Sequence, residues 1–180
     1  ARHLLADLGA PRAAIAAADP SDEWTPPLPL NADQGAAVRR AASAVDDVLV
    51  QGLPGTGKTS TIVCLVSLLV ARGARVLVCA GTNSAVDTGC LRLQRAGVGF
   101  ARVCMSSQHA GWADINVHPD VRPHIWDEGA LGSIEEARAA RSGVRVACAT
   151  AHSLHHGFFA GQCFDVAVVD EAGQMLQPVC

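Results

Sequence analysis

The chain has 180 residues, of which 49% are hydrophobic and 17% are charged, and its formal net charge is −3. This composition excludes a disordered chain, and the slightly acidic balance excludes nucleic-acid binding through overall basic charge. The length suffices for one sizeable core, and no apolar run reaches the roughly 18 residues that a membrane span needs.

Residues 1–29 are expected to be the end of a preceding region followed by a linker. The first twenty residues are rich in alanine and favour a helix, and the four prolines between residues 20 and 30 then favour an extended chain. A helix is predicted to open at Asn31, whose side chain would cap it, with Asp33 in its first turn. That helix should run to about residue 44.

Strands and helices alternate through the rest of the chain, which is predicted to form one domain over residues 30–180. The expected strands are 47–51, 75–80, 144–149 and 165–169, and the expected helices are 58–71, 83–96 and 134–141. Near-continuous apolar strands that alternate with helices predict an α/β fold, a parallel sheet with helices on both faces. Between about 104 and 133 the periodicity is lost, and we expect an inserted subdomain or a functional loop there.

Residues 52–59 read GLPGTGKT and match the phosphate-binding loop G-x-x-x-x-G-K-[ST] between a predicted strand and a predicted helix. Its glycines let successive backbone N–H groups face phosphate oxygens, and the helix N-terminus adds a positive dipole end. Lys58 would reach the β- and γ-phosphates, and the Thr59 hydroxyl would bind Mg²⁺. The predicted nucleotide-binding residues of this segment are Gly52, Pro54, Gly55, Thr56, Gly57, Lys58, Thr59 and Ser60.

The apolar strand at 165–169 ends in the acidic pair Asp170-Glu171, which is typical of the second half of such a site. Ligands of open α/β sheets bind at the carboxyl ends of the strands, where this pair is expected. We predict that Asp170 holds Mg²⁺, and that Glu171 orients and deprotonates the attacking water. Lys58 and Glu171 are therefore the predicted catalytic residues, and Gln174 is added to the nucleotide-binding set.

Five segments occur in the order LNxDQ, GLPGTGKT, TNSAVD, VACAT and FDVAVVDEAGQ. This set resembles the superfamily 1B helicases, a group that includes the RNA helicase of nonsense-mediated decay. The segments AGVGFAR, VHP and DEAGQMLQPVC further resemble one branch of that group, the eukaryotic DNA replication helicase/nucleases that process Okazaki fragments. The resemblance runs from about Leu30 to Cys180.

The resemblance implies a RecA-like P-loop NTPase fold, here an incomplete first motor domain. It implies Mg²⁺-dependent ATP hydrolysis that drives 5′-to-3′ translocation on single-stranded DNA, as part of replication and repair. The partners would be that DNA and a second RecA-like domain of a longer chain, which supplies arginine fingers. We therefore expect slow hydrolysis from this piece alone. A nuclear location is implied, and a mitochondrial one is left open.

The resemblance also assigns roles to single residues. Gln34 lies in the glutamine motif, whose amide pairs with adenine N6 and N7, so Gln34→Ala should weaken ATP binding and leave pyrophosphate binding unchanged. The predicted contacts with nucleic-acid phosphates come from Thr82, Asn83, Ser84 and Thr150.

Other functions stay open at this point. An RNA helicase of the same group fits the same segments, because no residue here reads the sugar. A non-catalytic nucleotide-binding or scaffold module is disfavoured by the complete acidic and basic set. A P-loop kinase is disfavoured by the DEA sequence at 170–172, and a GTPase by the absence of N-K-x-D. The seven cysteines form no C-x-x-C pair, which indicates a reducing compartment and no disulfide framework.

Overall fold

The computed structural model describes residues 24–44, 46–53, 55–105, 117–127 and 131–175. The chain divides into two compact units, Ala1–Ala74 and Arg75–Cys180, and each is described by itself. The expected domain boundary at residue 29 stays a prediction. None of the helices in the described residues is long and apolar enough to cross a membrane.

The first unit is built on two helices, α2 (Ala32–Ala42) and α3 (Lys58–Ala71). Asn31 caps α2 as expected, in a reciprocal capping box with Gln34. A small core joins the two helices through Val38, Ala42, Cys64 and Leu68, with Trp24, Leu28, Leu30 and Leu65 packed around it. The prediction of both helices is confirmed.

The expected strand at 47–51 is wrong. The structure gives this segment no strand conformation, and Leu49 is 90% exposed. Val48 and Val50 are also exposed. A strand needs a neighbour for its backbone N–H and C=O groups, and the described residues of this unit contain no strand. The apolar run by itself supplies no such neighbour.

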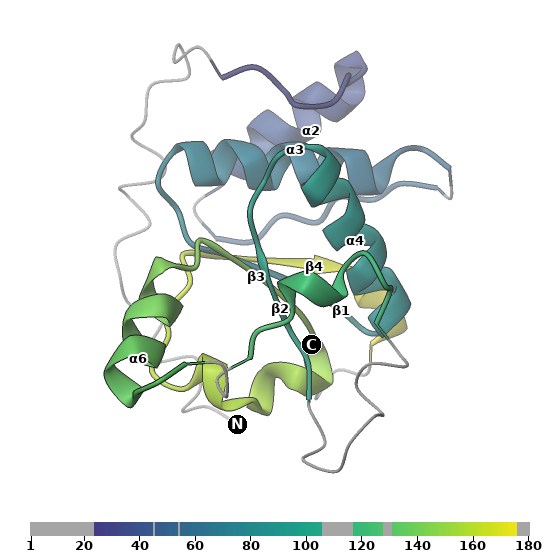
Figure 1. The fold of residues 1–180 in the computed structure, drawn as a ribbon. Coiled ribbons are helices and arrows are strands. Elements are labelled where there is room, and N and C mark those ends of the chain that lie inside the picture. Colours follow the sequence, from purple (N-terminus) through teal and green to yellow (C-terminus); the bar gives the residue numbers. More distant parts are fainter. Residues whose placement is uncertain (1–23, 45, 54, 106–116, 128–130, 176–180) are drawn as a thin grey trace. The chain divides into compact units, whose positions relative to one another are not determined.

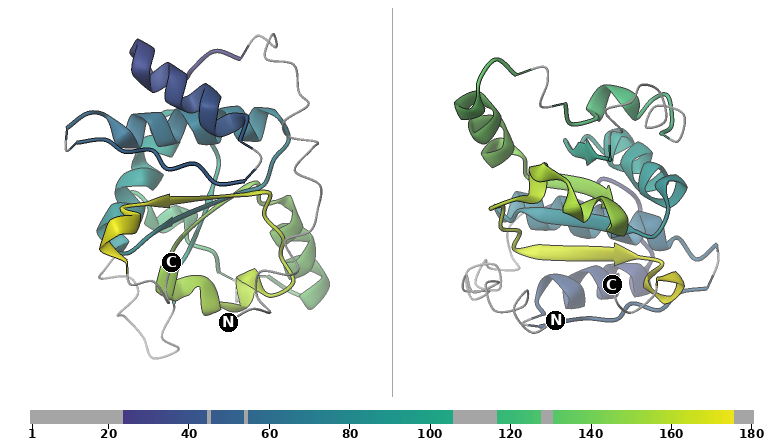
Figure 2. Two further views of the ribbon diagram at one scale, coloured as in Figure 1. Left: turned by 180° about the vertical axis from the view of Figure 1, so that it is seen from behind. Right: turned by 90° about the horizontal axis from the view of Figure 1, so that it is seen from below.

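The second unit is a parallel sheet with short helical segments (Figure 1). Its strands are β1 (Val76–Ala80), β2 (Ala101–Val103), β3 (Val146–Thr150) and β4 (Val166–Asp170), in the order β2-β3-β1-β4. Figure 2 shows β4 along one outer edge. Its helices are α4 (Asn83–Arg95) and α6 (Ile134–Gly143), with 3-10 turns η1 (Arg122–His124), η3 (Ala151–His155), η4 (Gly157–Phe159) and η5 (Ala172–Gln174). The α/β fold with a parallel sheet is confirmed.

Side chains of β3 alternate between the two faces of this sheet, as a strand requires. On one face Ala147 and Ala149 pack with Phe158 of η4 and Val103 of β2. On the other face Cys148 is hydrogen-bonded to a cysteine of α4, Cys90. That hydrogen bond, together with burial, raises the pKa of Cys148 well above the ordinary range. Strand β3 is therefore covered on both faces within this unit, whereas Ala167 and Val169 of the edge strand β4 are exposed.

Strand β2 was not predicted, and it connects the described part of the 104–133 segment to the sheet. Arg102 pairs with Cys148 of β3 on one side and forms an isolated parallel bridge with Ile125 on the other. The Trp126 backbone N–H donates to the Arg102 carbonyl at 2.9 Å. Residues 117–127 thus extend the sheet beyond β2, although sequence periodicity gives no sign of it.

The amino end of the sheet is fixed by Arg75, which sequence reasoning missed. Its guanidinium donates to the carbonyl of Cys163 at 2.9 Å and to that of Val144 at 3.3 Å. The same group lies over the ring of Phe164, 5.1 Å from its centroid. The backbone N–H of Arg75 also donates to the Asp165 carboxylate at 2.7 Å. These contacts all lie at the amino end of the sheet, opposite the carboxyl end where the predicted site residues of this unit are located.

Candidate nucleotide and nucleic-acid sites

The phosphate-binding loop leads directly into α3. Gly55 and Gly57 have φ of +80° and +82°, a left-handed conformation that glycine adopts without strain. Gly57 is the N-cap of α3, and Lys58 is the first residue of the helix. The N–H groups of a first helical turn have no partner within the helix, so this turn presents donors to an anion. The local geometry matches the predicted phosphate cradle.

The Lys58 side chain folds back over the loop. Its ammonium donates to the carbonyl of Gly52 at 2.8 Å and to that of Leu53 at 3.2 Å. A Cβ at Gly52 would lie 2.9 Å from Lys58 Cγ and from Thr56 Oγ1, so this position needs glycine. Lys58 therefore closes the loop by bonding two of its carbonyl oxygens. A bound phosphate is a stronger acceptor and can replace these carbonyls as the partner of the ammonium.

Gln34 contacts the same loop, a contact that the sequence did not predict. Its side-chain oxygen accepts from the Asn31 backbone N–H at 3.0 Å, and its amide nitrogen donates to the Thr56 carbonyl at 2.9 Å. A Cβ added to Gly57 would lie 2.5 Å from that nitrogen. The amide that was expected to read adenine thus also supports the phosphate loop.

The carboxyl ends of three strands are level in the second unit. Ala80 of β1 is paired with Thr150 of β3 on one side and with Asp170 of β4 on the other. The segments that follow these three residues therefore emerge at one edge of the sheet. This edge brings together the predicted nucleic-acid residues and the predicted acidic pair, as the open-sheet rule requires.

The acidic pair forms a tight turn. The Glu171 backbone N–H donates to an Asp170 carboxylate oxygen at 2.9 Å, and Glu171 has φ of +54°. No other described residue except glycine has positive φ, and a non-glycine residue in this region costs about 1–3 kcal/mol. Glu171 is exposed, and Gln174 follows in η5.

The predicted nucleic-acid residues lie in different surroundings. Thr82 is the exposed N-cap of α4, and its hydroxyl accepts from the Ala85 backbone N–H at 3.2 Å. Ser84 is exposed. Thr150 is buried, with its hydroxyl 2.8 Å from that of Ser153. Contacts of these residues with nucleic acid stay predictions.

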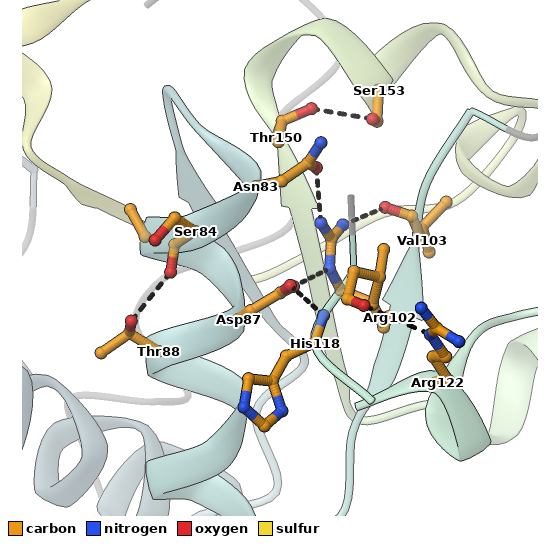
Figure 3. A network of polar contacts seen from close by, with 12 residues as sticks. Asn83, Ser84, Asp87, Thr88, Arg102, Val103, His118, Arg122, Thr150 and Ser153 are labelled. Atoms are coloured by element: carbon orange, nitrogen blue, oxygen red, sulfur yellow. Dashed lines mark hydrogen bonds and ion pairs between the residues drawn. The ribbon is translucent and has the colours of Figure 1, made fainter. Parts of the chain in front are cut away.

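A buried ion pair lies beneath this edge, and sequence reasoning missed it (Figure 3). Arg102 of β2 is 0% exposed, and its Nε donates to the Asp87 carboxylate of α4 at 2.9 Å. The second oxygen of that carboxylate accepts from the His118 backbone N–H at 2.7 Å. Asn83, the first residue of α4, accepts from Arg102 Nη2 at 2.7 Å. The segments TNSAVD, GFAR and VHP, which supported the resemblance, are therefore joined by one ion pair, because Asp87 bonds both Arg102 and the His118 backbone.

The two predicted Mg²⁺ ligands, Thr59 in the first unit and Asp170 in the second, each have donor chemistry that suits the ion. The Thr59 hydroxyl and the Asp170 carboxylate are hard oxygen donors, and Mg²⁺ in nucleotide sites takes one or two protein ligands beside substrate phosphates and water. No group of three or more metal-ligating side chains occurs in the described part of the chain. Such a cage is not what Mg²⁺ needs when phosphates complete its shell. Pro54 lies outside the described residues.

Comparison with known proteins supports the resemblance. The chain is 34% identical over 99% of its length to the DNA replication ATP-dependent helicase/nuclease JHS1 of Arabidopsis thaliana. It is 36% identical over 84% of its length to the DNA replication ATP-dependent helicase/nuclease DNA2 of Mus musculus, and 30% identical over 99% to that of Saccharomyces cerevisiae.

The chain spans only 13%, 14% and 11% of the length of these three relatives. Their nuclease and other activities therefore cannot be transferred to it from the identity alone. The sequence model of the family described as "AAA domain" matches residues 29–139, which is more than half of the chain. That match begins before Gln34 and includes the whole phosphate-binding loop. The chain therefore belongs to the AAA domain family.

Proposed function

We propose that this chain is the ATP-hydrolysing motor segment of a DNA helicase that translocates 5′ to 3′ on single-stranded DNA in replication and repair. The observation that carries the proposal is the loop at 52–59, with left-handed Gly55 and Gly57 leading into the N-terminus of α3. The similarity to replication helicase/nucleases supports the choice of a helicase over other ATPases. The second RecA-like domain and a nuclear location belong to the same proposal.

Nucleotide binding is assigned to the first unit. The N–H groups at the start of α3 would bind the phosphates, and Lys58 would exchange its two carbonyl partners for the β- and γ-phosphate oxygens. A phosphate is the stronger acceptor because it is charged. Thr59 and Asp170 would hold Mg²⁺, and the bound ion would neutralise the negative charge of the phosphates.

Hydrolysis is assigned to Glu171. Its carboxylate is exposed at the carboxyl edge of the sheet and would orient the attacking water and accept its proton. Glu171 adopts a left-handed backbone conformation immediately after β4. Asp170 is fixed by the Glu171 backbone N–H.

Base selection is assigned to Gln34, with one change from the sequence expectation. Because Gln34 donates to the Thr56 carbonyl, adenine binding and the shape of the phosphate loop depend on the same amide. We therefore no longer expect pyrophosphate binding to be independent of Gln34. Gln34→Ala should weaken both ATP and pyrophosphate binding.

The experiment that tests the proposal separates binding from turnover. Lys58→Ala should lose affinity for a fluorescent ATP analogue, since the lysine compensates phosphate charge in the bound state. Glu171→Gln should keep that affinity and, in the full-length enzyme, lose ATP turnover, since the glutamate acts on water. The full-length wild type should show turnover that single-stranded DNA stimulates more than RNA does. Equal loss of nucleotide binding in both variants would contradict the assigned roles, and preferential stimulation by RNA would favour an RNA helicase.

A further inference from the structure

The ion pair between Arg102 and Asp87 joins three chain segments beneath the carboxyl edge of the sheet. We infer that Arg102 is a positioning residue for nucleic-acid binding: it fixes the Asn83 side-chain amide so that the NH₂ group of Asn83 points away from Arg102 and can donate to a backbone phosphate. This inference rests on the proposed function, because it assumes that the start of α4 contacts nucleic acid.

The orientation of the Asn83 amide follows from the chemistry of arginine. A guanidinium has five N–H donors and no acceptor, so only the oxygen of an amide can face it. Arg102 Nη2 lies 2.7 Å from Asn83 Oδ1. The amide nitrogen must then point away from Arg102, as Figure 3 shows. A surface asparagine without such a partner would rotate freely between its two orientations.

The guanidinium itself is held on its other sides. Its Nε is bonded to Asp87 at 2.9 Å, and its Nη1 donates to the Val103 carbonyl at 2.7 Å. Both charged groups are buried, with side-chain exposures of 0% for Arg102 and 6% for Asp87. A planar group held at two nitrogens by other partners cannot turn, so it provides a rigid reference for Asn83.

The position of Asn83 suits a phosphate. It follows the N-cap of α4, where first-turn N–H groups and the helix dipole favour an anion, and its neighbours Thr82 and Ser84 are exposed. Asparagine side chains commonly donate to phosphate oxygens in complexes with nucleic acid. An ordered amide loses less conformational entropy on binding than a mobile one. The buried arginine thereby contributes to affinity without contacting the ligand.

The test uses the full chain and a labelled single-stranded oligodeoxythymidine. Asn83→Ala removes the NH₂ donor without adding a charge, so it should lose roughly tenfold in DNA affinity. Asn83→Asp keeps an oxygen for Arg102 but adds a negative charge that repels phosphate, so it should lose at least as much. Arg102→Lys keeps a charge beside Asp87 and removes the fixed donor to Asn83, so affinity should fall severalfold. Because neither Asn83→Ala nor Arg102→Lys removes a cationic phosphate contact, their slopes of log affinity against log salt should match wild type.

A double-mutant cycle decides whether Arg102 acts through Asn83. In the Asn83→Ala background, Arg102→Lys should cause no further loss of DNA affinity. Arg95→Lys, the same substitution at the exposed end of α4, is the matched control and should bind DNA as wild type does. Melting temperatures of all variants identify any that are unfolded, and Asn83→Ala tests the donor while leaving the charges of Arg102 and Asp87 in place.

The outcomes separate this inference from the proposed function. If wild type binds no single-stranded DNA, the proposed function fails and this inference fails with it. If wild type binds DNA and Asn83→Ala binds as well as wild type, only this inference is overturned. Additive losses from Asn83→Ala and Arg102→Lys would also overturn it, because the arginine would then act independently of the asparagine.

Discussion

Gly57→Ala provides a quantitative test of the contact between the phosphate loop and α2. Gly57 has φ of +82°, where a residue with a Cβ pays about 1–2 kcal/mol. The added Cβ would lie 2.5 Å from the amide nitrogen of Gln34, which would have to move and leave the Thr56 carbonyl. Losing that hydrogen bond costs about 1 kcal/mol more. We therefore expect the free energy of unfolding to fall by about 2–3 kcal/mol.

Two glycines with nearly the same backbone serve as controls. Gly55 and Gly73 have φ of +80° and +83°, and a Cβ at either would meet nothing within 4 Å. Gly73→Ala lies outside the loop and should show the backbone cost alone, about 1–2 kcal/mol. Gly55→Ala should show the same cost inside the loop. The difference between Gly57→Ala and these controls measures the Gln34 contact.

Urea unfolding, analysed by linear extrapolation, gives these differences, and titration with a fluorescent ATP analogue reports the loop. In a Gln34→Ala background, Gly57→Ala should cost no more than Gly73→Ala, because the obstructing amide is gone. If Gly57→Ala and Gly73→Ala destabilise equally in the wild-type background, the reasoning about this contact is refuted.

Four further predictions concern the ion pair, the cysteines and the base-binding glutamine. Asp87→Ala leaves the Arg102 charge buried without its partner and should reduce the free energy of unfolding by about 3–5 kcal/mol in urea; a loss below about 1 kcal/mol would show that the pair is dispensable. Exposed Cys163 should react with a thiol reagent in the folded chain and Cys148 only on unfolding, and prompt labelling of both would contradict the described burial. A hydrogen bond with a neighbouring thiol, together with burial, raises the pKa of Cys148, so the folded state favours the protonated thiol. The contribution of this thiol to the free energy of unfolding should be full below about pH 8.5 and should be lost as pH rises through the raised pKa. Gln34→Ala should narrow the gap between ATP and GTP affinities and weaken pyrophosphate binding, and competition titrations that leave both unchanged would remove Gln34 from the site.

Much of the chain could be predicted because the deciding interactions are local. The capping box at Asn31 uses groups three residues apart, and the apolar runs of β1 and β3 follow from burial on both faces of a sheet. The glycines at 55 and 57 were expected from the loop motif, and their left-handed backbone is what that motif needs. A contiguous motif fixes such conformations with little help from the rest of the protein.

The tertiary structure decided what depends on partners distant in sequence. Residues 47–51 have the composition of a strand, but the described residues of their unit contain no strand with which they could pair. A strand forms when its backbone N–H and C=O groups bond to a neighbouring strand, and apolar side chains alone do not provide those bonds. Arg102 looks like an ordinary charged residue in sequence, yet it is fully buried because Asp87 lies 15 positions earlier on the facing helix. Gln34 reaches the loop 22 residues away. The sequence predicts which residues carry the chemistry, and the packing of separate segments determines what holds Arg102 and Gln34 in place, since a buried charge or amide is stable only where the fold supplies its partner.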